Sequence, residues 1–525
     1  MQPIDFAVVL IYFAIITILG LRFGGRVRTS RDYFLANAGL PWWAVCLSVV
    51  ATETSTLTFI SLPGLAYITN LNFLQLGIGY IIGRTLVAFL FLPAYLRGDM
   101  ATSYELLAGR FGPHVRTLSS LIFLITRLLA DGVRLYATAI PLSIMTKLSL
   151  PSCIVIIAMV TLLYTSMGGL RSVVWIDVIQ AFIYVGGAVI AGLYILSTLP
   201  NGWQSLIDAA GADKLQIFNP SFDKSPAEFL QINYTLAASL IGGAFLSMAS
   251  HGTDQMIVQR LLACRQIRDA QKALISSGFI VLLQFTIFLV LGLLLYAFYH
   301  GVAMPSDEIL PRFIIQELPA GLSGLIIASV FAAAMSTLSS SLNSMASSTL
   351  FDLLLPHIKM MPQKQLLISR LSTVLWGIIF TGGAMLFRSS ENPVVELGLA
   401  ISSFTYGAVL GAFFLATTKA RFGEADILVS LWATIVHMTW FIGPHPAVLA
   451  ILLGLAGIVG GWIFFTIDRA ARLYQLALTG LAAMLFIFVD SPQIAWPWYV
   501  PIGTILMMIL GTVSSQVVKG ERRTK

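Results

Sequence analysis

Long apolar runs with almost no charged residues constrain this chain more than any other feature of its sequence. A run of about 20 such residues matches the hydrocarbon core of a bilayer and predicts a transmembrane helix. The chain contains fifteen candidate spans, at residues 4–21, 42–69, 72–96, 117–146, 150–168, 172–198, 232–259, 272–299, 320–352, 367–387, 393–417, 426–442, 446–466, 474–489 and 497–518. Only 10% of the residues are charged, compared with about 25% in soluble domains. We therefore expect an all-α integral membrane protein in which residues 1–525 form a single membrane domain.

Basic residues indicate which ends of the spans face the cytoplasm. Lys and Arg gather in alternate loops, for example at residues 22–31, 260–272 and 519–525, whereas the intervening loops carry few. Because cytoplasmic loops are enriched in Lys and Arg, we expect a multi-pass protein of the cell membrane with its N-terminus outside and its C-terminus in the cytoplasm. The same distribution explains the net charge of +7 without a nucleic-acid partner. The sequence shows no obligate protein partner.

Neither the cysteines nor the titratable residues indicate an enzyme. Cys46, Cys153 and Cys264 lie in or beside apolar runs, at no metal-ligand spacing, so we expect neither a disulfide framework nor a metal cluster. An intramembrane enzyme would need a nucleophile with a base, or a metal cluster, and the sequence lacks the His, Asp and Glu spacing for either. The sequence favours a carrier.

Polar stretches in two spans predict broken helices. The second span contains the run ATETSTLT at residues 51–58, and the seventh contains Gly242 and Gly243 followed by polar residues at 247–254. Such groups are costly at bilayer depth unless they face protein or water. Carbonyls and hydroxyls freed by a break would form a hard-oxygen site for an alkali cation, although the hydroxyls could instead bond back to their own helix.

The two interrupted spans are five spans apart, which is typical of transporters built from inverted repeats. The predicted organisation is a leading helix at 4–21, repeats at 42–198 and 232–417, and extra C-terminal helices at 426–518.

The ninth span holds a serine-rich stretch at residues 336–344. Ser336, Ser339 and Ser340 share one helix face, and a hydroxyl stripe of this kind could coordinate a desolvated sodium ion. Close packing of helices through small residues is the alternative. For the serines that follow, at 344, 347 and 348, we prefer the packing interpretation.

Five motifs, in this order along the chain, resemble the solute/sodium symporter family. They are DYFLA at 32–36 before PWW, TSYE at 102–105 with RFG at 110–112, GGLR at 168–171 with Asp177, TDQ at 253–255 with VQR at 258–260, and the serine-rich stretch ending in LNS at 342–344. The match runs to about residue 420.

The resemblance implies a LeuT-type 5+5 inverted repeat with one extra leading helix and additional C-terminal helices, about 14–15 transmembrane helices in total. It also implies sodium-coupled symport of a small organic solute (a sugar, a sugar acid or another organic anion) by alternating access. A proton-coupled carrier of the same fold, using Glu53 or Asp177, is the alternative.

Carried over residue by residue, the resemblance implies one or two sodium sites. The first uses the carbonyls of Ala51, Thr54 and Ala333 and the hydroxyls of Ser336 and Thr337. The second uses Asp177, Ser336, Ser339 and Ser340. For Asp177, a plain carboxylate at a helix N-terminus is the alternative.

The resemblance also implies a solute site between the broken helices. The positions that match solute contacts in relatives are Glu53, Ser55, Thr58, Asn72, Gln75, Ser247, Ser250 and His251, with Ser403 and Tyr406 closing the site. We expect a polar cavity with few aromatic residues. His251 replaces the aromatic ring of sugar carriers and is either a solute ligand or a core histidine. Glu53 would bind an ammonium or a hydroxyl, hold a proton or pair with an arginine.

The fourth span carries Arg127, Asp131 and Arg134. The resemblance to sialic acid carriers implies that an arginine on this helix binds the solute carboxylate, for which a guanidinium is suited. The spacing of Asp131 allows an ion pair with either arginine, so at least one of them is expected to be internal. We favour Arg134 as the solute ligand and an organic anion such as a sugar acid as the solute.

Overall fold

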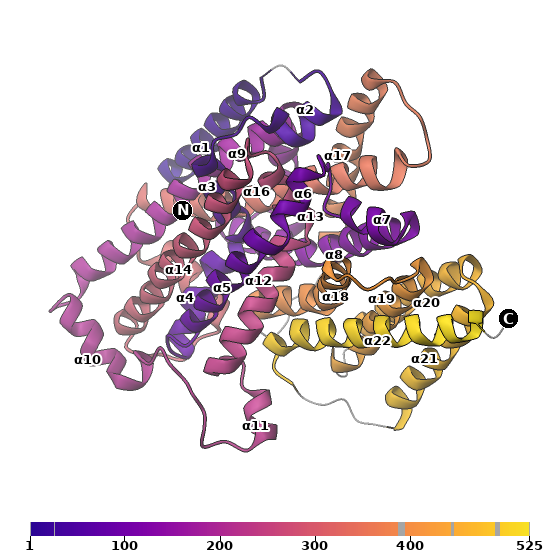
Figure 1. The fold of residues 1–525 in the computed structure, drawn as a ribbon. Helices are drawn as coiled ribbons and strands as arrows, with labels where there is room; N and C mark the ends of the chain where they lie inside the picture. Colours follow the sequence, from indigo (N-terminus) through magenta and orange to yellow (C-terminus); the bar gives the residue numbers. More distant parts are fainter. Residues whose placement is uncertain (1, 26, 387–393, 443–445, 489–493, 524–525) are drawn as a thin grey trace.

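The computed structural model describes residues 2–25, 27–386, 394–442, 446–488 and 494–523. These residues are helical apart from their loops and one isolated β-bridge between Leu40 and Cys264. The helices gather in one bundle (Figure 1). Seven described helices are long and apolar enough to cross a membrane, or eight if a bent pair counts as one span. The larger count of about 14–15 remains a prediction.

The first part of the bundle holds the leading helix and the first predicted repeat. Its helices are α1 (Pro3–Phe23), α2 (Ser30–Leu35), α3 (Trp42–Glu53), α4 (Thr56–Ile68), α5 (Leu74–Leu90), α6 (Leu92–Arg97), α7 (Glu105–Phe111), α8 (Pro113–Thr146) and α9 (Leu150–Thr198). The fifth and sixth candidate spans both lie in α9, which consists of two helices that meet at a kink at Gly169. Gly169 has a φ of +59°, and a Cβ there would lie 2.4 Å from the Tyr33 carbonyl oxygen, so the kink requires glycine.

The second part holds the second predicted repeat and its outer loop. Its elements are α10 (Trp203–Lys214), α11 (Pro226–Gln231), the π-helical turn η2 (Ala238–Gly242), α12 (Gly243–Gly252), α13 (Gln255–Leu262), α14 (Ile267–Phe298), α15 (Ser306–Gln316), α16 (Leu322–Ser348), the π-helical turn η3 (Thr349–Leu354), α17 (Pro362–Ala384) and α18 (Val394–Thr417). Both predicted breaks are present, between α3 and α4 and between α12 and α13. Gly242 and Gly243 lie before the second break, where η2 continues into α12.

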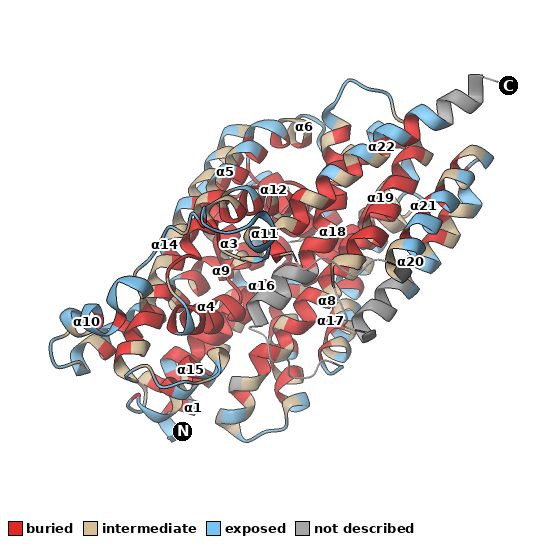
Figure 2. Cartoon of the chain, turned by 90° about the horizontal axis from the view of Figure 1, so that it is seen from below, coloured by how far each residue is buried: buried red, intermediate tan, exposed pale blue. Residues whose placement is uncertain are grey.

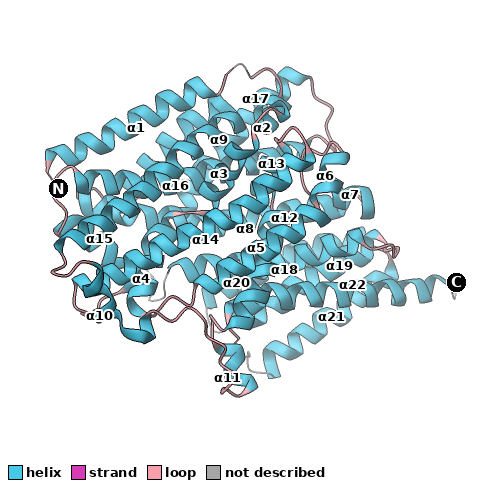
Figure 3. Ribbon diagram, turned by 60° about the vertical axis from the view of Figure 1, so that its left-hand side comes forward, coloured by secondary structure: helices cyan, strands magenta, loops and turns pink. Residues whose placement is uncertain are grey.

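The C-terminal part covers α18. It consists of α19 (Glu424–Thr439), η4 (Trp440–Ile442), α20 (Pro446–Thr466), α21 (Arg469–Phe488), η5 (Trp496–Trp498) and α22 (Tyr499–Arg523). In Figure 1 these orange and yellow helices form a group beside the rest of the bundle. The two ends of the chain lie at opposite ends of the molecule (Figure 3).

Burial is greatest along the middle of the bundle, and exposed residues cover its outer helices (Figure 2). The helix α16 is the most enclosed of the long helices, because its Ala and Ser side chains let α1, α8 and α9 approach closely. Asp5 of α1 fixes the start of α16: its Oδ1 accepts hydrogen bonds from the amides of Gly321 at 2.7 Å and Gly324 at 3.0 Å. A carboxylate at this place also interacts favourably with the helix dipole.

The helices α5 and α12 pack backbone against backbone. A Cβ at Gly83 would lie 2.3 Å from the Ala244 carbonyl oxygen, and one at Gly79 would lie 2.5 Å from that of Ser239. From the other side, a Cβ at Gly243 would lie 2.8 Å from the Leu76 carbonyl oxygen. Glycines on both helices therefore allow the close contact.

Candidate functional site

The break between α3 and α4 bends the chain by 63°. The helix α3 ends at Glu53, and the next two residues, Thr54 and Ser55, have extended backbone before α4 begins. The last carbonyls of a helix have no amide partner in that helix. The break therefore presents free backbone oxygens in the interior of the bundle.

Two hydroxyls of α16 meet these oxygens. Ser336 Oγ lies 2.7 Å from the carbonyl oxygen of Ala51 and 3.1 Å from that of Ala333. Thr337 Oγ1 lies 3.1 Å from the carbonyl oxygen of Thr52 and 3.4 Å from that of Ala333. All five residues are buried. The result is a compact cluster of neutral oxygens that joins the break to α16.

This cluster contains four of the five residues expected to bind the first sodium ion, and it fits that ion. Carbonyl and hydroxyl oxygens are the hard ligands that alkali cations prefer, and they are placed at the unwound backbone of a broken helix. The fifth residue, Thr54, belongs to the break, and its hydroxyl accepts a hydrogen bond from Gln284 at 2.5 Å. The carbonyl of Thr52 joins the set; Thr52 belongs to the polar run at residues 51–58 but not to the five residues that the resemblance implied.

The residues expected at the second sodium site surround an arginine. Asp177 is buried in α9 and its Oδ2 accepts hydrogen bonds from Ser48 at 2.6 Å and Arg260 at 3.3 Å. Arg260 also donates to Ser340. Asp177 Oδ1 is buried without a hydrogen-bond partner.

Two hydroxyls complete this group, since Ser339 and Ser340 donate to the Ser336 carbonyl oxygen at 3.1 and 2.5 Å. The alternative of a carboxylate at a helix N-terminus does not hold for Asp177, which lies in the interior of α9, well beyond the kink at Gly169.

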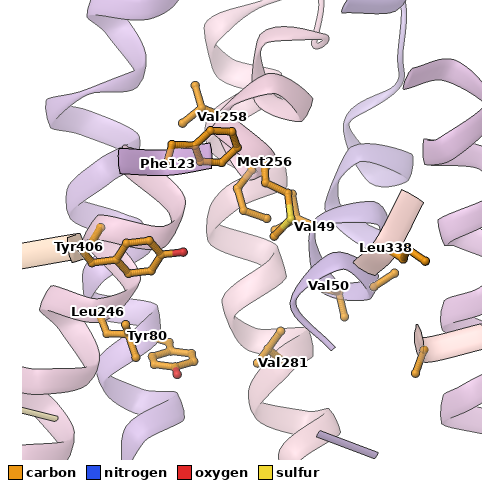
Figure 4. Packing of buried hydrophobic residues seen from close by; sticks show 14 of the residues in the cluster. Val49, Val50, Tyr80, Phe123, Leu246, Met256, Val258, Val281, Leu338 and Tyr406 are labelled. Carbon is orange, nitrogen blue, oxygen red and sulfur yellow. The ribbon is translucent and has the colours of Figure 1, made fainter. Parts of the chain in front are cut away.

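A pocket opens beside the first break. Its lining residues come from the two broken helices and from α5, α8, α14 and α18: Thr52, Glu53, Ser55, Leu57, Thr58, Leu62, Phe73, Tyr80, Arg127, Arg134, Leu246, Ser250, His251, Met256, Ile257, Phe285, Ser402 and Tyr406. In Figure 4, Tyr80, Leu246 and Tyr406 lie close to one another, and the Tyr406 hydroxyl points towards the middle of the view. Most of the residues expected to bind the solute therefore share one pocket with the break.

One side of the pocket carries a glutamate, an arginine and a histidine. Arg84 of α5, which is fully buried, donates one hydrogen bond to Glu53 and another to Ser277, the latter at 2.7 Å. His251 Nδ1 lies 2.8 Å from Ser250 Oγ. Its Nε2 lies 3.6 Å from Glu53 Oε2 and has no hydrogen-bond partner. Of the roles considered for Glu53, the structure shows pairing with an arginine.

Another side carries the two arginines of α8. Arg127 Nη2 lies 2.6 Å from Asp254 Oδ2 and also contacts the hydroxyl of Tyr406. Arg134 Nη1 lies 2.5 Å from Asp131 Oδ1, and Arg127 lies 3.5 Å from the other oxygen of Asp131. Both arginines thus make the expected internal ion pair, but Arg127 has a second carboxylate and Arg134 does not in the contacts described.

Four residues expected to bind the solute lie outside the pocket lining, and the side chains of two of them bond to neighbouring backbone. Gln75 donates to the carbonyl oxygens of Asn72 and Tyr234, both at 3.1 Å, and holds the outer loop. Ser247 faces α5 and donates to the Tyr80 carbonyl oxygen at 3.1 Å. Asn72 is buried just before α5, and its backbone N–H donates to Asn70 Oδ1 at 3.0 Å. Ser403 is also buried, and its neighbour Ser402 lines the pocket instead.

The expectation of few aromatic residues was wrong. Phe73, Tyr80, Phe285 and Tyr406 all line the pocket, so it has aromatic walls although His251 replaces one ring. They come from helices that approach the break only in the folded bundle. Arg84 was missed as well, although a lone charge in the apolar third span is a signal of function or pairing.

Comparisons with known proteins agree with this geometry. The sequence profile of the Sodium:solute symporter family matches residues 33–443. This chain belongs to that family. It is therefore a multi-pass membrane transporter that couples the uptake of a solute to sodium.

Relatives and a solved structure support the assignment. The sodium/sialic acid symporter SiaT of Proteus mirabilis is 28% identical over 82% of this chain and 88% of its own length. Human sodium-coupled monocarboxylate transporter 1 is 29% identical over 83% of this chain and 72% of its own length. The substrate-bound, outward-open structure of a Na+-coupled sialic acid symporter superimposes with a TM-score of 0.80, at 25% identity and 98% coverage of both chains. The fold is therefore of the LeuT type, as the motifs predicted.

Proposed function

We propose that this sodium symporter carries a small organic anion, such as a sugar acid, and that Arg134 binds its carboxylate. The observation that carries the proposal is the unequal pairing of the two arginines on α8. Arg127 is held by Asp254 and Tyr406. Arg134 also lines the pocket, but Asp131 is its ion-pair partner in the contacts described, and its Nε, like that of Arg127, is buried without a hydrogen-bond partner. A guanidinium with donors left over suits a carboxylate.

The names of the relatives support an anion as the solute. SiaT is named for sialic acid and the human transporter for monocarboxylates, and a third relative, the human sodium/iodide cotransporter, is 27% identical over 80% of this chain. The aromatic rings in the pocket add apolar surface that suits the carbon skeleton of such a solute.

The break between α3 and α4 would couple sodium to the solute. The carbonyls of Ala51 and Thr52 belong to the oxygen cluster, and the side chains of Thr52, Glu53 and Ser55 line the solute pocket. An ion bound by Ala51, Thr54, Ala333, Ser336 and Thr337 would fix the break against α16 and would thereby order the pocket. Coupling of this kind is reciprocal, so the solute would also raise the affinity for sodium. A second ion at Asp177, Ser336, Ser339 and Ser340 would make the stoichiometry two.

The ion pairs of Glu53 with Arg84 and of Asp177 with Arg260 argue against the proton-coupled alternative, which would use one of these two carboxylates. We further propose that the chain is not an enzyme, and that it lies in the cell membrane with its N-terminus outside and its C-terminus in the cytoplasm.

Uptake into proteoliposomes tests the proposal. With an inward sodium gradient we expect accumulation of at least one of N-acetylneuraminate, D-glucuronate and pyruvate, and none when choline replaces sodium. Arg134→Ala should weaken that uptake at least about tenfold, because a buried contact between Arg and a carboxylate contributes a few kcal/mol. Arg31→Ala removes an exposed ion pair with Asp99 and serves as the matched control. Unchanged anion uptake in Arg134→Ala, or uptake of neutral D-glucose in place of all three anions, would refute the proposal.

A further inference from the structure

We propose that Glu53 and His251 together bind a hydroxyl group of the transported anion, so that the carrier selects hydroxylated carboxylates over unsubstituted ones. This inference rests on the proposed function, because it places the hydroxyl on the anion whose carboxylate Arg134 binds. It names two residues that determine specificity and the chemical group that they recognise.

The first observation is an unsatisfied nitrogen in the pocket wall. The His251 residue is 2% exposed and lines the pocket. Its Nδ1 is engaged by Ser250, but its Nε2 has no hydrogen-bond partner, and Glu53 at 3.6 Å is too distant to be one. A buried polar atom without a partner is costly, so a group that enters the pocket and satisfies it would bind there.

The second observation is the charge balance around Glu53. The carboxylate can only accept hydrogen bonds. Arg84 already donates to it and neutralises its charge, and Arg84 is itself fixed by Ser277. The Glu53 side chain remains 18% exposed. This wall of the pocket therefore needs a neutral donor, and a solute ammonium would add a charge that has no counter-ion.

A hydroxyl satisfies both groups at once. It can donate to the Glu53 carboxylate, and it can accept from His251 Nε2–H in the tautomer in which Nδ1 accepts from the Ser250 hydroxyl. An apolar group at the same place would leave His251 Nε2 unpaired and could not donate to Glu53, and an ionised carboxylate could not donate to Glu53 either, because both carboxylates only accept hydrogen bonds. Discrimination should be strong, because a site built to bind a hydroxyl rejects an analogue that lacks it.

The position of the pair connects the hydroxyl to both broken helices. Glu53 is the last residue of α3, next to the break that bears the oxygen cluster. His251 lies in the last turn of α12, just before the second break at Asp254. A hydroxyl bound between them would bridge the two helix ends.

Two carboxylates with a six-membered ring provide the test: D-glucuronate, which carries hydroxyls, and cyclohexanecarboxylate, which carries none. Binding of each to the purified, full-length protein in sodium is measured by calorimetry. We expect the wild type to bind D-glucuronate at least about tenfold more tightly, the effect of one hydrogen bond to a charged group. His251→Leu should lose most of this preference, and His251→Gln should regain part of it because its amide can still donate. His437→Leu, which replaces a buried histidine bonded within α19, is the matched control.

The outcomes separate this inference from the proposed function. Two results would overturn the role of His251 and Glu53: equal affinity of the wild type for the two acids, or an equal loss of affinity for both acids in His251→Leu. Arg134→Ala should weaken the binding of both acids equally. If Arg134→Ala shows this loss of binding but His251→Leu binds both acids as the wild type does, the carboxylate site is supported and the hydroxyl site is refuted. If neither acid binds but neutral D-glucose does, and His251→Leu abolishes that binding, the hydroxyl site stands and the anion proposal falls. Binding of none of the three refutes both.

Discussion

The oxygen cluster at the first break joins backbone and side-chain ligands from helices that are distant in sequence. Ser336 and Ala51 are 285 residues apart, yet their oxygens lie 2.7 Å from each other. Each hydroxyl now donates to a carbonyl, and a bound cation would draw the same oxygens together through their lone pairs. Oxygens grouped in this way reduce the reorganisation that binding of a cation requires.

Removal of both hydroxyls should therefore weaken sodium binding. In the variant with Ser336→Ala and Thr337→Ala, we expect the sodium concentration for half-maximal uptake to rise at least about tenfold, since about 1.4 kcal/mol gives that factor. Sodium titration of solute uptake measures it. Ser344→Ala is the control, because Ser344 lies in the same helix and bonds to the Ser341 carbonyl oxygen. An unchanged sodium dependence in the double variant would place the site elsewhere.

Much of this residue-scale chemistry could be predicted, and the part that could not has a common cause. The run of hydroxyls at residues 51–58 predicts a break because polar groups at bilayer depth require protein or water around them. The charge partners are different: Glu53 pairs with Arg84 from another helix, and Asp177 with Arg260, 83 residues away. Such pairs depend on how whole helices rotate and pack, which no local pattern contains.

At the scale of elements, the helix α1 holds the start of α16, the helix that supplies Ser336 and Thr337. Asp5 accepts two amide hydrogen bonds at that helix N-terminus and is 2% exposed. Its loss would leave both amides without their partner and remove a charge that the helix dipole favours.

Asp5→Ala should accordingly destabilise the protein by about 1–2 kcal/mol. Thermal unfolding in detergent should show a lower midpoint, and sodium affinity should fall with it because α16 is held less firmly. Asp223→Ala, in an exposed loop, is the control and should leave the midpoint unchanged. A normal midpoint in Asp5→Ala would show that α1 does not support α16.

The contact between α5 and α12 makes a second prediction at this scale. Gly83→Ala would place a methyl group 2.3 Å from the Ala244 carbonyl oxygen. Overpacking costs about 1–3 kcal/mol, whereas the gain from replacing glycine within a helix is at most about 1 kcal/mol, so the variant should be less stable. In the control Gly186→Ala, the new Cβ meets no atom within 4 Å, so this variant should show only the gain in stability from replacing a glycine within a helix. Equal midpoints for the two variants in thermal unfolding would contradict the close contact.

The helices that lie outside the candidate spans are short, with 6 to 12 residues each: α2, α7, α10, α11 and α15. The helix α15 covers only 11 residues and contains Pro311, so a search for runs of bilayer length passes over it. The kink at Gly169, which divides α9 into two helices, could be anticipated as the gap between the fifth and sixth candidate spans. Long apolar spans are fixed by the bilayer, and the connections between them depend on local packing.

For the whole molecule, the two ends of the chain lie at opposite ends of the bundle (Figures 1 and 3). This agrees with an odd number of crossings. From the distribution of Lys and Arg we propose that the C-terminal end lies in the cytoplasm.

A green fluorescent protein fused to the C-terminus should therefore fluoresce in bacterial cells, because it folds in the cytoplasm and fails when exported unfolded. An epitope tag at the N-terminus should be accessible to antibody in intact cells. The converse fusion, with alkaline phosphatase at the C-terminus, is the control and should be inactive. An active phosphatase would reverse the orientation.

The close contact between α5 and α12 also bears on how new carriers evolve from this scaffold. One face of α12 leaves no room for change, because Gly243 and Ala244 touch the backbone of α5. Another face presents Leu246, Ser250 and His251 to the pocket. A lineage could therefore replace pocket residues one at a time and change its solute specificity, while the neighbouring face holds α12 in place against α5. Diversity among descendants should accumulate on the pocket face of α12.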